Sequence, residues 1–414
     1  MHTVCIFNGP HLMQVKARNR AGNNVASMIA VPLQQASPPA ALWSAGFRPF
    51  FLLAAIWAAL AVPAWLAVYV HGYSLPAALP ALYWHAHEMI YGYGLAAVAG
   101  FLLTAIPNWT GRLPVRGAPL AGLAALWLLG RVAAFTPAPW LDLAFPLALM
   151  AVVAREVASA RNFHNLPVVA ILGVLFAGNL LVQLHALGIA STAALGNRIG
   201  VATLLLLIAL IGGRLVPSFT RNWMAREMPG ARPPAPHSAL DWACLVLGLC
   251  GLAAWVVAPD SPFSFGLQMT GGAALAVRLA RWRGLATVRE PLLFVLHAGY
   301  GWLAAGLAFA GANGFLGWMP AGAPLHALTV GAIGTMTLAV MTRASLGHCG
   351  RALHAGPGTS AIYLLVTLAA ALRFAAPLLG GHALLTTALA GCAWSAAFAL
   401  FAILYAPLLI GRKQ

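Results

Sequence analysis

Residues 84–112 read WHAHEMIYGYGLAAVAGFLLTAIPNWTGR, a long apolar run that opens with two histidines and a glutamate. From Met89 to Ile106 the run contains no charged side chain. About 20 consecutive apolar residues are enough for one α-helix to cross a bilayer. The stretch therefore predicts a transmembrane helix with ionisable groups at its entry end.

The whole chain has the same apolar character. Of its 414 residues, 61% are hydrophobic and 7% are charged, and the mean hydropathy is +0.85. Soluble domains carry about 25% charged residues, so this composition excludes a soluble globular protein. The net charge of +16 could suit nucleic acid, but the basic residues are scattered between apolar runs. We assign this charge to membrane topology and predict lipid, and no nucleic acid, as a partner.

The apolar runs predict an all-α polytopic protein with about twelve transmembrane helices in a single domain, residues 47–410. Residues 1–46 are polar and lack the apolar core of a signal peptide, which predicts a cytoplasmic tail. The expected spans are 48–70, 83–107, 117–135, 139–157, 166–188, 197–219, 239–258, 264–281, 291–312, 323–345, 359–379 and 383–409.

The basic residues predict the orientation of these spans. With both termini cytoplasmic, 20 of the 23 Lys and Arg residues fall in cytoplasmic segments, and only Arg131, Arg198 and Arg373 do not. Short loops rich in Lys or Arg resist translocation, so this bias indicates which face is inside. It predicts a multi-pass protein of the bacterial inner membrane.

The opening stretch also aligns without a gap to residues 323–351, APLHALTVGAIGTMTLAVMTRASLGHCGR. The alignment places His87 on His326 and Gly92 on Gly331. Both segments belong to helices that are predicted to run inward from the outer face. The similarity suggests an internal repeat that brings two histidines to one membrane depth.

Histidines inside apolar segments are the strongest candidates for chemistry, because hydrocarbon does not solvate ionisable groups. Imidazole is the commonest metal ligand and suits haem iron and copper, and the thioether of Met89 would favour Cu(I). We predict that His87 and His326 hold one haem iron from opposite faces, with His85 as the competing iron ligand. His85 points away from His87 on a regular helix, so it could bind copper with Met89. The alternative is an aromatic belt with satisfied interfacial histidines.

Other polar groups have secondary predicted roles. His297 and His348 lie toward the cytoplasmic ends of their helices and could form an inner metal site. Glu88 could orient a ligating histidine from the second shell, and Arg343 could handle substrate or protons. Salt bridges at the membrane interface are the alternative for both. The chain has no Cys-x-x-Cys-His sequence, so any haem would be b-type and non-covalent.

Several motifs resemble the NnrS family, over about residues 43–410. They lie at 46–51, 84–89, 100–105, 108–111, 212–214, 219–223, 296–300, 326–331, 341–344 and 347–348. This resemblance implies a haem- and copper-containing inner-membrane protein of the nitric oxide response, in denitrifying or nitrosatively stressed bacteria. The histidines at 85, 87, 297, 326 and 348 lie inside these motifs.

Three functions compete at this point. The first is binding or turnover of nitric oxide or its products by haem and copper, with an electron donor if the protein is an oxidoreductase. The second is transport of a metal or a nitrosylated species, although inverted repeats are not evident. The third is a scaffold for a respiratory complex.

Overall fold

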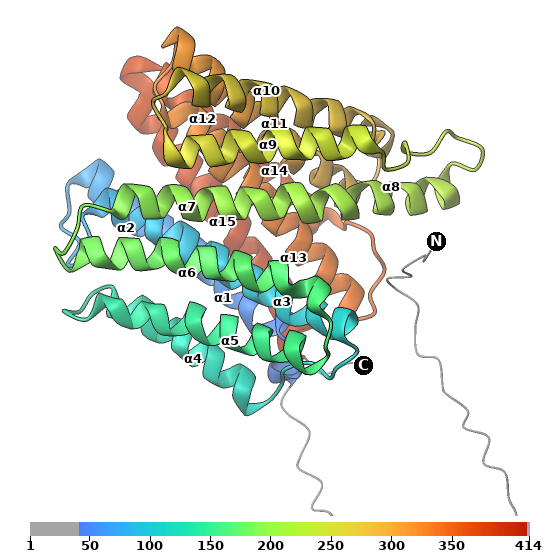
Figure 1. Ribbon diagram of the computed structural model, residues 1–414, viewed down its shortest axis with the longest axis horizontal. Helices are drawn as coiled ribbons and strands as arrows, with labels where there is room; N and C mark the ends of the chain where they lie inside the picture. The colour runs from blue at the N-terminus through green and yellow to red at the C-terminus, as the bar shows by residue number, and fades with distance from the viewer. Residues whose placement is uncertain (1–40, 412–414) are drawn as a thin grey trace, which may run out of the picture. The chain divides into compact units, whose positions relative to one another are not determined.

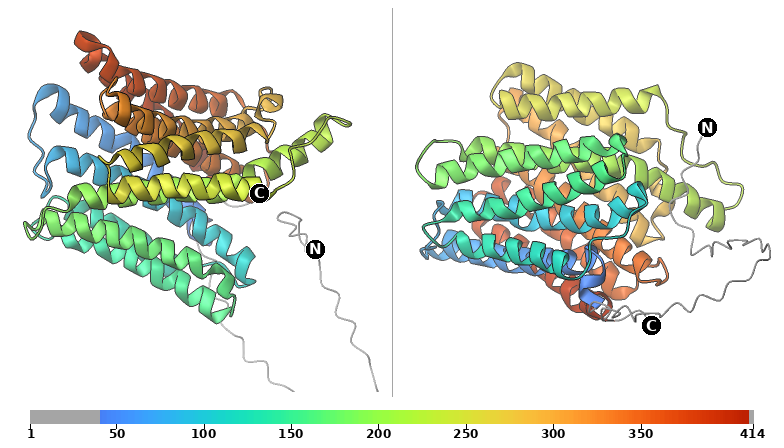
Figure 2. Two further views of the ribbon diagram at one scale, coloured as in Figure 1. Left: turned by 45° about the horizontal axis from the view of Figure 1, so that its top comes forward. Right: turned by 60° about the horizontal axis from the view of Figure 1, so that its bottom comes forward.

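The computed structural model describes residues 41–411, so residues 1–40 of the predicted polar tail lie outside the described residues. From residue 41 to residue 411 the regular elements are all helices, which confirms the all-α prediction. Figure 1 shows the long helices running side by side as a bundle, and Figure 2 shows the same arrangement from two other sides.

The long elements alternate with short 3-10 and π-helical segments. In chain order they are η1 Ala41–Ser44, α1 Phe47–His71, α2 Ala81–His87, η2 Glu88–Gly94, α3 Leu95–Thr110, α4 Ala118–Ala133, η3 Pro139–Leu143, α5 Ala144–Ser159, η4 Phe163–Asn165, α6 Leu166–Ala186, α7 Ala193–Leu207, η5 Ile208–Gly212, α8 Gly213–Glu227, α9 Ala239–Val257, α10 Pro262–Ala280, η6 Gly284–Thr287, α11 Pro291–Leu316, α12 Gly322–His326, η7 Ala327–Gly334, α13 Thr335–His348, α14 Pro357–Ala375, η8 Ala376–Leu378, η9 Gly380–His382 and α15 Ala383–Ile410.

Within residues 41–411, nine helical segments are long and apolar enough to cross a membrane. The chain is therefore a multi-pass membrane protein. The predicted spans 117–135, 139–157 and 264–281 form α4, α5 and α10, which are not among the nine. The predicted count of twelve spans and the cytoplasmic position of both termini stay predictions.

Small residues let neighbouring helices approach closely, as in other membrane bundles. A Cβ atom on Gly272 of α10 would lie 2.3 Å from the backbone nitrogen of Ala308 of α11. A Cβ atom on Gly251 of α9 would lie 2.7 Å from the carbonyl oxygen of Leu267 of α10. Large apolar side chains such as Leu60, Leu364 and Ile403 instead face outward. This distribution suits a bundle surrounded by lipid.

Three long helical segments contain a π-helical stretch: η2, η5 and η7. Two of these stretches follow the aligned histidines directly, since η2 begins after His87 and η7 begins after His326. The α-helix resumes at Leu95 in one segment and at Thr335 in the other. The two segments therefore share an architecture as well as five identical residues, which supports the alignment. π-helical stretches are frequent at functional sites.

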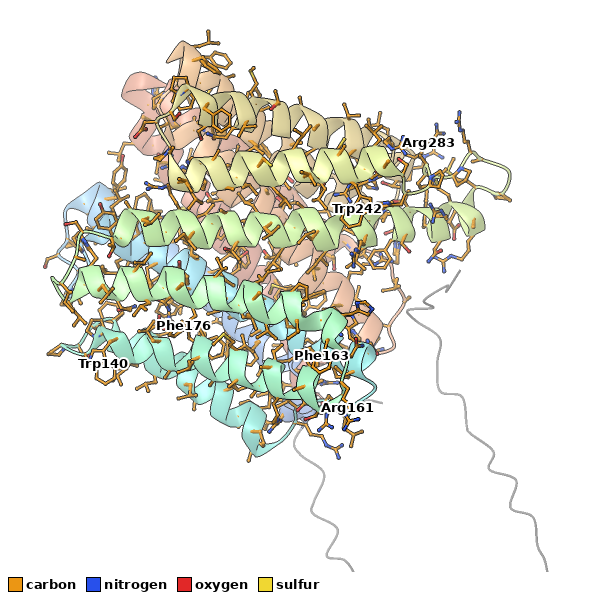
Figure 3. The ribbon with its side chains drawn as sticks, in the orientation of Figure 1. Trp140, Arg161, Phe163, Phe176, Trp242 and Arg283 are labelled. Carbon is orange, nitrogen blue, oxygen red and sulfur yellow. The ribbon has the colours of Figure 1, made fainter. Side chains whose placement is uncertain are left out.

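The two ends of the bundle carry different side chains. In Figure 3 the labelled residues Arg161 and Arg283 lie toward the same end, and Trp140 lies toward the other. Both arginines were predicted to be cytoplasmic. The side chain of Trp140 is 50% exposed, and amphipathic Trp rings are typical of a membrane interface.

Candidate functional site

The side chain of His85 projects from α2 onto aromatic rings of α1. Its ring stacks on Trp65 with centroids 4.3 Å apart, and Trp65 stacks on Tyr69 at 4.9 Å. The Nδ1 atom of His85 is buried and has no hydrogen-bond partner within residues 41–411. A buried imidazole nitrogen without a partner is destabilising unless a ligand binds it. His85 therefore has the coordination capacity that a metal ligand requires.

His326 is the last residue of α12, at the start of the other aligned segment. Its Nδ1 atom lies 2.6 Å from the carbonyl oxygen of Gly322, one helical turn earlier. A carbonyl oxygen only accepts, so Nδ1 carries the hydrogen and Nε2 carries the lone pair. Histidines that bind metals commonly donate their other N–H to a backbone carbonyl in this way. His326 is also close enough to His85 for direct electrostatic interaction.

The helices that carry these two histidines also meet deeper in the bundle. The hydroxyl groups of Tyr93 in η2 and Thr337 in α13 share a short hydrogen bond. The Tyr93 ring also packs edge-on against Trp394 and Phe398 of α15. The structure thus places His85 and His326 at the same end of two adjacent helical segments. The predicted shared depth of these two side chains stays a prediction.

His87 has a different environment, and the contacts of its ring correct its predicted role. Its Nδ1 atom lies 3.0 Å from Oε1 of Glu88. Its Nε2 atom lies 3.0 Å from Oδ1 of Asn179 and 3.1 Å from Oδ2 of Asp142. Both ring nitrogens already have oxygen partners, so neither is available to iron. These contacts disagree with the predicted iron at His87, and the competing choice of His85 as the iron ligand stays a prediction.

As predicted, the side chains of His85 and His87 point in different directions, because their rings have different neighbours. Oxygen acceptors at both nitrogens of His87 require an N–H at each, so the ring is an imidazolium. Oxygens of Glu88 and Asp142 provide its counter-charges. Glu88 also accepts a hydrogen bond of 2.8 Å from Nε1 of Trp57. Glu88 therefore contacts His87, and its predicted role beside a metal-binding histidine stays a prediction.

Arg131 of α4 completes this buried charge network. Its guanidinium donates short hydrogen bonds to Glu88 and to Asp142 and lies over the rings of Trp57 and Trp127. Two carboxylates, one guanidinium and one imidazolium sum to zero charge. That balance is what a site without bulk water requires, because an uncompensated buried charge is strongly destabilising.

Sequence reasoning missed Arg131, Asp142 and Asn179 as members of this network. The signal was present, because Arg131 and Asp142 are ionisable residues within predicted apolar spans. Ionisable residues in apolar spans are usually functional, but that expectation was stated for histidines, Glu88 and Arg343 and not for this pair. Asn179 of α6 donates to Asp142 at 2.8 Å, and Gln183 lies one turn further on the same helix.

The predicted inner site is not formed. Nε2 of His297 lies 2.9 Å from the hydroxyl of Thr220, whereas the ring of His348 packs on Phe47 with centroids 5.4 Å apart. Gly299 of α11 faces Met336 of α13, and α11 and α13 run in opposite directions. At 1.5 Å per residue, His348 lies about 18 Å beyond Met336, and His297 only about 3 Å beyond Gly299. The two histidines therefore lie at different depths.

The remaining predicted site residues form no further metal-binding cluster within residues 41–411. Across residues 41–411, no set of three or more His, Cys, Asp or Glu side chains is arranged to hold a metal ion. Met89 lies in η2, one turn after His85, and Arg343 packs on the ring of Phe219 at 4.1 Å. Among the described residues, the unpartnered Nδ1 of His85 and the Nε2 lone pair of His326 remain as a candidate two-histidine site.

Comparison with known proteins adds the family. No curated protein sequence matches the chain. The NnrS protein family matches residues 41–413, which is nearly the whole chain. The two-histidine site, the charge network and the three π-helical stretches all lie within that match. The chain belongs to the NnrS family.

Proposed function

We propose that this protein binds b-type haem between His85 and His326 and uses it in the nitric oxide response, at the inner membrane of a bacterium. Family membership links the chain to nitric oxide. The observation that carries the haem proposal is the pair of imidazoles, one with an unpartnered Nδ1 and one with its Nδ1 hydrogen held by Gly322.

The residues present fit the cofactor. Two histidines from two helices are a common way to hold haem within a bundle. Trp65, stacked on His85, restricts the orientation of that ring, and Gly322 fixes the tautomer of His326. Iron held by two imidazoles is six-coordinate and supplies electron transfer or, after loss of one ligand, nitric oxide binding. Copper remains part of the proposal through the family alone, because the described histidines do not converge on a second site.

The charge network has a separate role beside the haem ligands. His87 lies two residues from His85 and is held by α4, η3 and α6 through Arg131, Asp142 and Asn179. These contacts fix the first turn of the helical segment that carries His85. The network therefore positions one ligand and, because its four charges cancel, adds no net charge beside the site.

Absorption and EPR spectra of purified single variants test the haem ligands. We expect His85→Ala and His326→Ala each to lose six-coordinate low-spin haem. His87→Gln should keep it, and so should the control His185→Ala, which removes another histidine near the same end of the bundle. A wild-type haem spectrum in either His85→Ala or His326→Ala would overturn the ligand assignment. Absence of a Soret band in wild-type protein made with adequate haem would overturn haem binding itself.

Nitric oxide handling requires a second measurement. With a nitric oxide electrode and a chemical electron donor, the wild-type protein should consume nitric oxide, or should show a nitrosyl haem spectrum if it only binds the gas. Neither response should occur in the double variant His85→Ala/His326→Ala, which lacks both proposed iron ligands. A haem-loaded protein that shows neither response would favour the transport or scaffold function.

A further inference from the structure

Arg373 lies near the end of α14, at the same end of the bundle as His85 and His326. α14 packs against α12, which ends at His326, and against η7, which begins at the next residue. Arg373 also interacts electrostatically with Tyr69 of α1, and Tyr69 stacks on Trp65, the ring that supports His85. The positive charge of Arg373 also acts electrostatically on both histidines, which agrees with this placement.

The guanidinium of Arg373 lacks a counter-charge. In the part of the chain that the structure describes, it forms no hydrogen bond and no ion pair. The buried arginines behave differently: Arg131 binds two carboxylates, and Arg278 donates to the Ala209 carbonyl at 3.0 Å. Two neutral imidazoles and a phenol give Arg373 no negative partner. A half-buried arginine at a membrane protein site normally has one.

We propose that Arg373 binds a propionate carboxylate of the haem, and so sets which edge of the macrocycle faces the end of the bundle where Arg373 lies. Haem carries two carboxylates on one edge, and the planar guanidinium binds a carboxylate through two parallel N–H groups. This inference rests on the proposed haem site. It adds a residue on α14 to the ligands on α2 and α12.

Arg198 is the closest comparison within the chain. It was predicted to lie on the same side of the membrane, it is half-buried, and its Nε atom is buried without a partner. It is not among the charged groups that act on His85 or His326. Arg198→Gln therefore removes an arginine of similar exposure without changing the proposed contact.

The test compares two forms of haem in three full-length proteins. Wild type, Arg373→Gln and Arg198→Gln are depleted of haem in detergent. Each is then reloaded with haem or with haem whose two propionates are methyl esters. The rate of haem transfer to excess apomyoglobin is followed by absorption. A charge-assisted Arg–carboxylate contact implies that Arg373→Gln releases haem about 10- to 100-fold faster than wild type.

With the methyl ester form, wild type and Arg373→Gln should release haem at equal rates, because the carboxylate is absent from both. Equal rates with unmodified haem would overturn the proposal. So would an acceleration by Arg373→Gln that is the same for both forms, because it would show a role in the fold alone. An ester-dependent effect in Arg198→Gln and none in Arg373→Gln would also overturn it. A wild-type protein that takes up neither form would instead reject the haem site.

Discussion

The Nε2 atom of His87 and the Oδ2 atom of Asp142 lie 3.1 Å apart, which joins the end of α2 to η3 inside the bundle. Neither side chain reaches water to any extent, since His87 is 1% exposed and Asp142 is 2% exposed. Arg131 binds both Asp142 and Glu88, the two carboxylates that flank the imidazole. His87 is therefore a structural cation beside a candidate metal ligand, and the first predictions concern this network.

Arg131→Gln should destabilise the protein strongly. The substitution leaves two buried carboxylates facing one imidazolium, and removal of one member of a buried ion pair typically costs about 3–5 kcal/mol. We expect a large fall in the thermal unfolding temperature in detergent. Arg112→Gln is the control, because Arg112 binds Glu156 at 2.5 Å from a side chain that is 44% exposed, where such pairs contribute about 1 kcal/mol or less. Equal losses in the two variants would contradict this account.

Glu88→Gln should raise the reduction potential of the haem while the protein keeps its six-coordinate spectrum. Glu88 accepts bonds from His87, Trp57 and Arg131, so its carboxylate acts beside the site and is not an iron ligand. Removal of a buried negative charge disfavours ferric iron relative to ferrous iron. A spectroelectrochemical titration measures the change. Complete loss of haem would show that Glu88 is itself an iron ligand. An unchanged reduction potential would show that the charge network does not act on the haem.

Gly213→Ala should destabilise the junction between η5 and α8. A Cβ atom there would lie 2.4 Å from Nη1 of Arg278, whose guanidinium is held by Ala209 and Tyr300 and has little room to move. Overpacking of this kind typically costs about 1–3 kcal/mol. Gly122→Ala is the matched control on α4, since nothing lies within 4 Å of its added Cβ. Thermal unfolding should show a loss for the first variant and none for the second.

Arg48→Ala should loosen the end of α15. The Arg48 guanidinium donates to the carbonyl oxygens of Leu409 at 2.8 Å and Gly411 at 3.0 Å, so it caps a helix that begins more than 300 residues later. The last carbonyls of a helix have no intrahelical donors. We expect faster carboxypeptidase trimming of the C-terminus in Arg48→Ala than in wild type. The same rate in both would show that the cap is not needed.

Reporter fusions test the predicted orientation. Alkaline phosphatase fused within the α8–α9 connection, residues 228–238, should be inactive, and green fluorescent protein at the same place should fluoresce. The expectation rests on Arg232 in this connection and on Arg221 and Arg226 just before it, which would resist translocation. Active phosphatase at this position would reverse the assignment of the His85–His326 end to the outer face.

The sequence alone was sufficient for the class of protein and for the elements of the bundle. Apolar runs such as 84–112 and 383–409 predict helices, because a chain in lipid must satisfy its backbone hydrogen bonds within each segment. Those helices are present as α2 to α3 and as α15. The paired histidines and the repeat around His87 and His326 were also visible, since they depend only on local order along the chain.

Only the tertiary structure decided which histidine is available to a ligand. His85 and His87 are equivalent in type and nearly so in position, and a metal could be assigned to either from the sequence. The choice depends on three other helical elements: oxygens of Asp142 and Asn179 lie against Nε2 of His87, and Arg131 holds Asp142 in place. His85 stacks on the ring of Trp65, and its buried Nδ1 has no hydrogen-bond partner within residues 41–411. Contacts between distant segments follow from packing, because local periodicity does not specify which helices become neighbours.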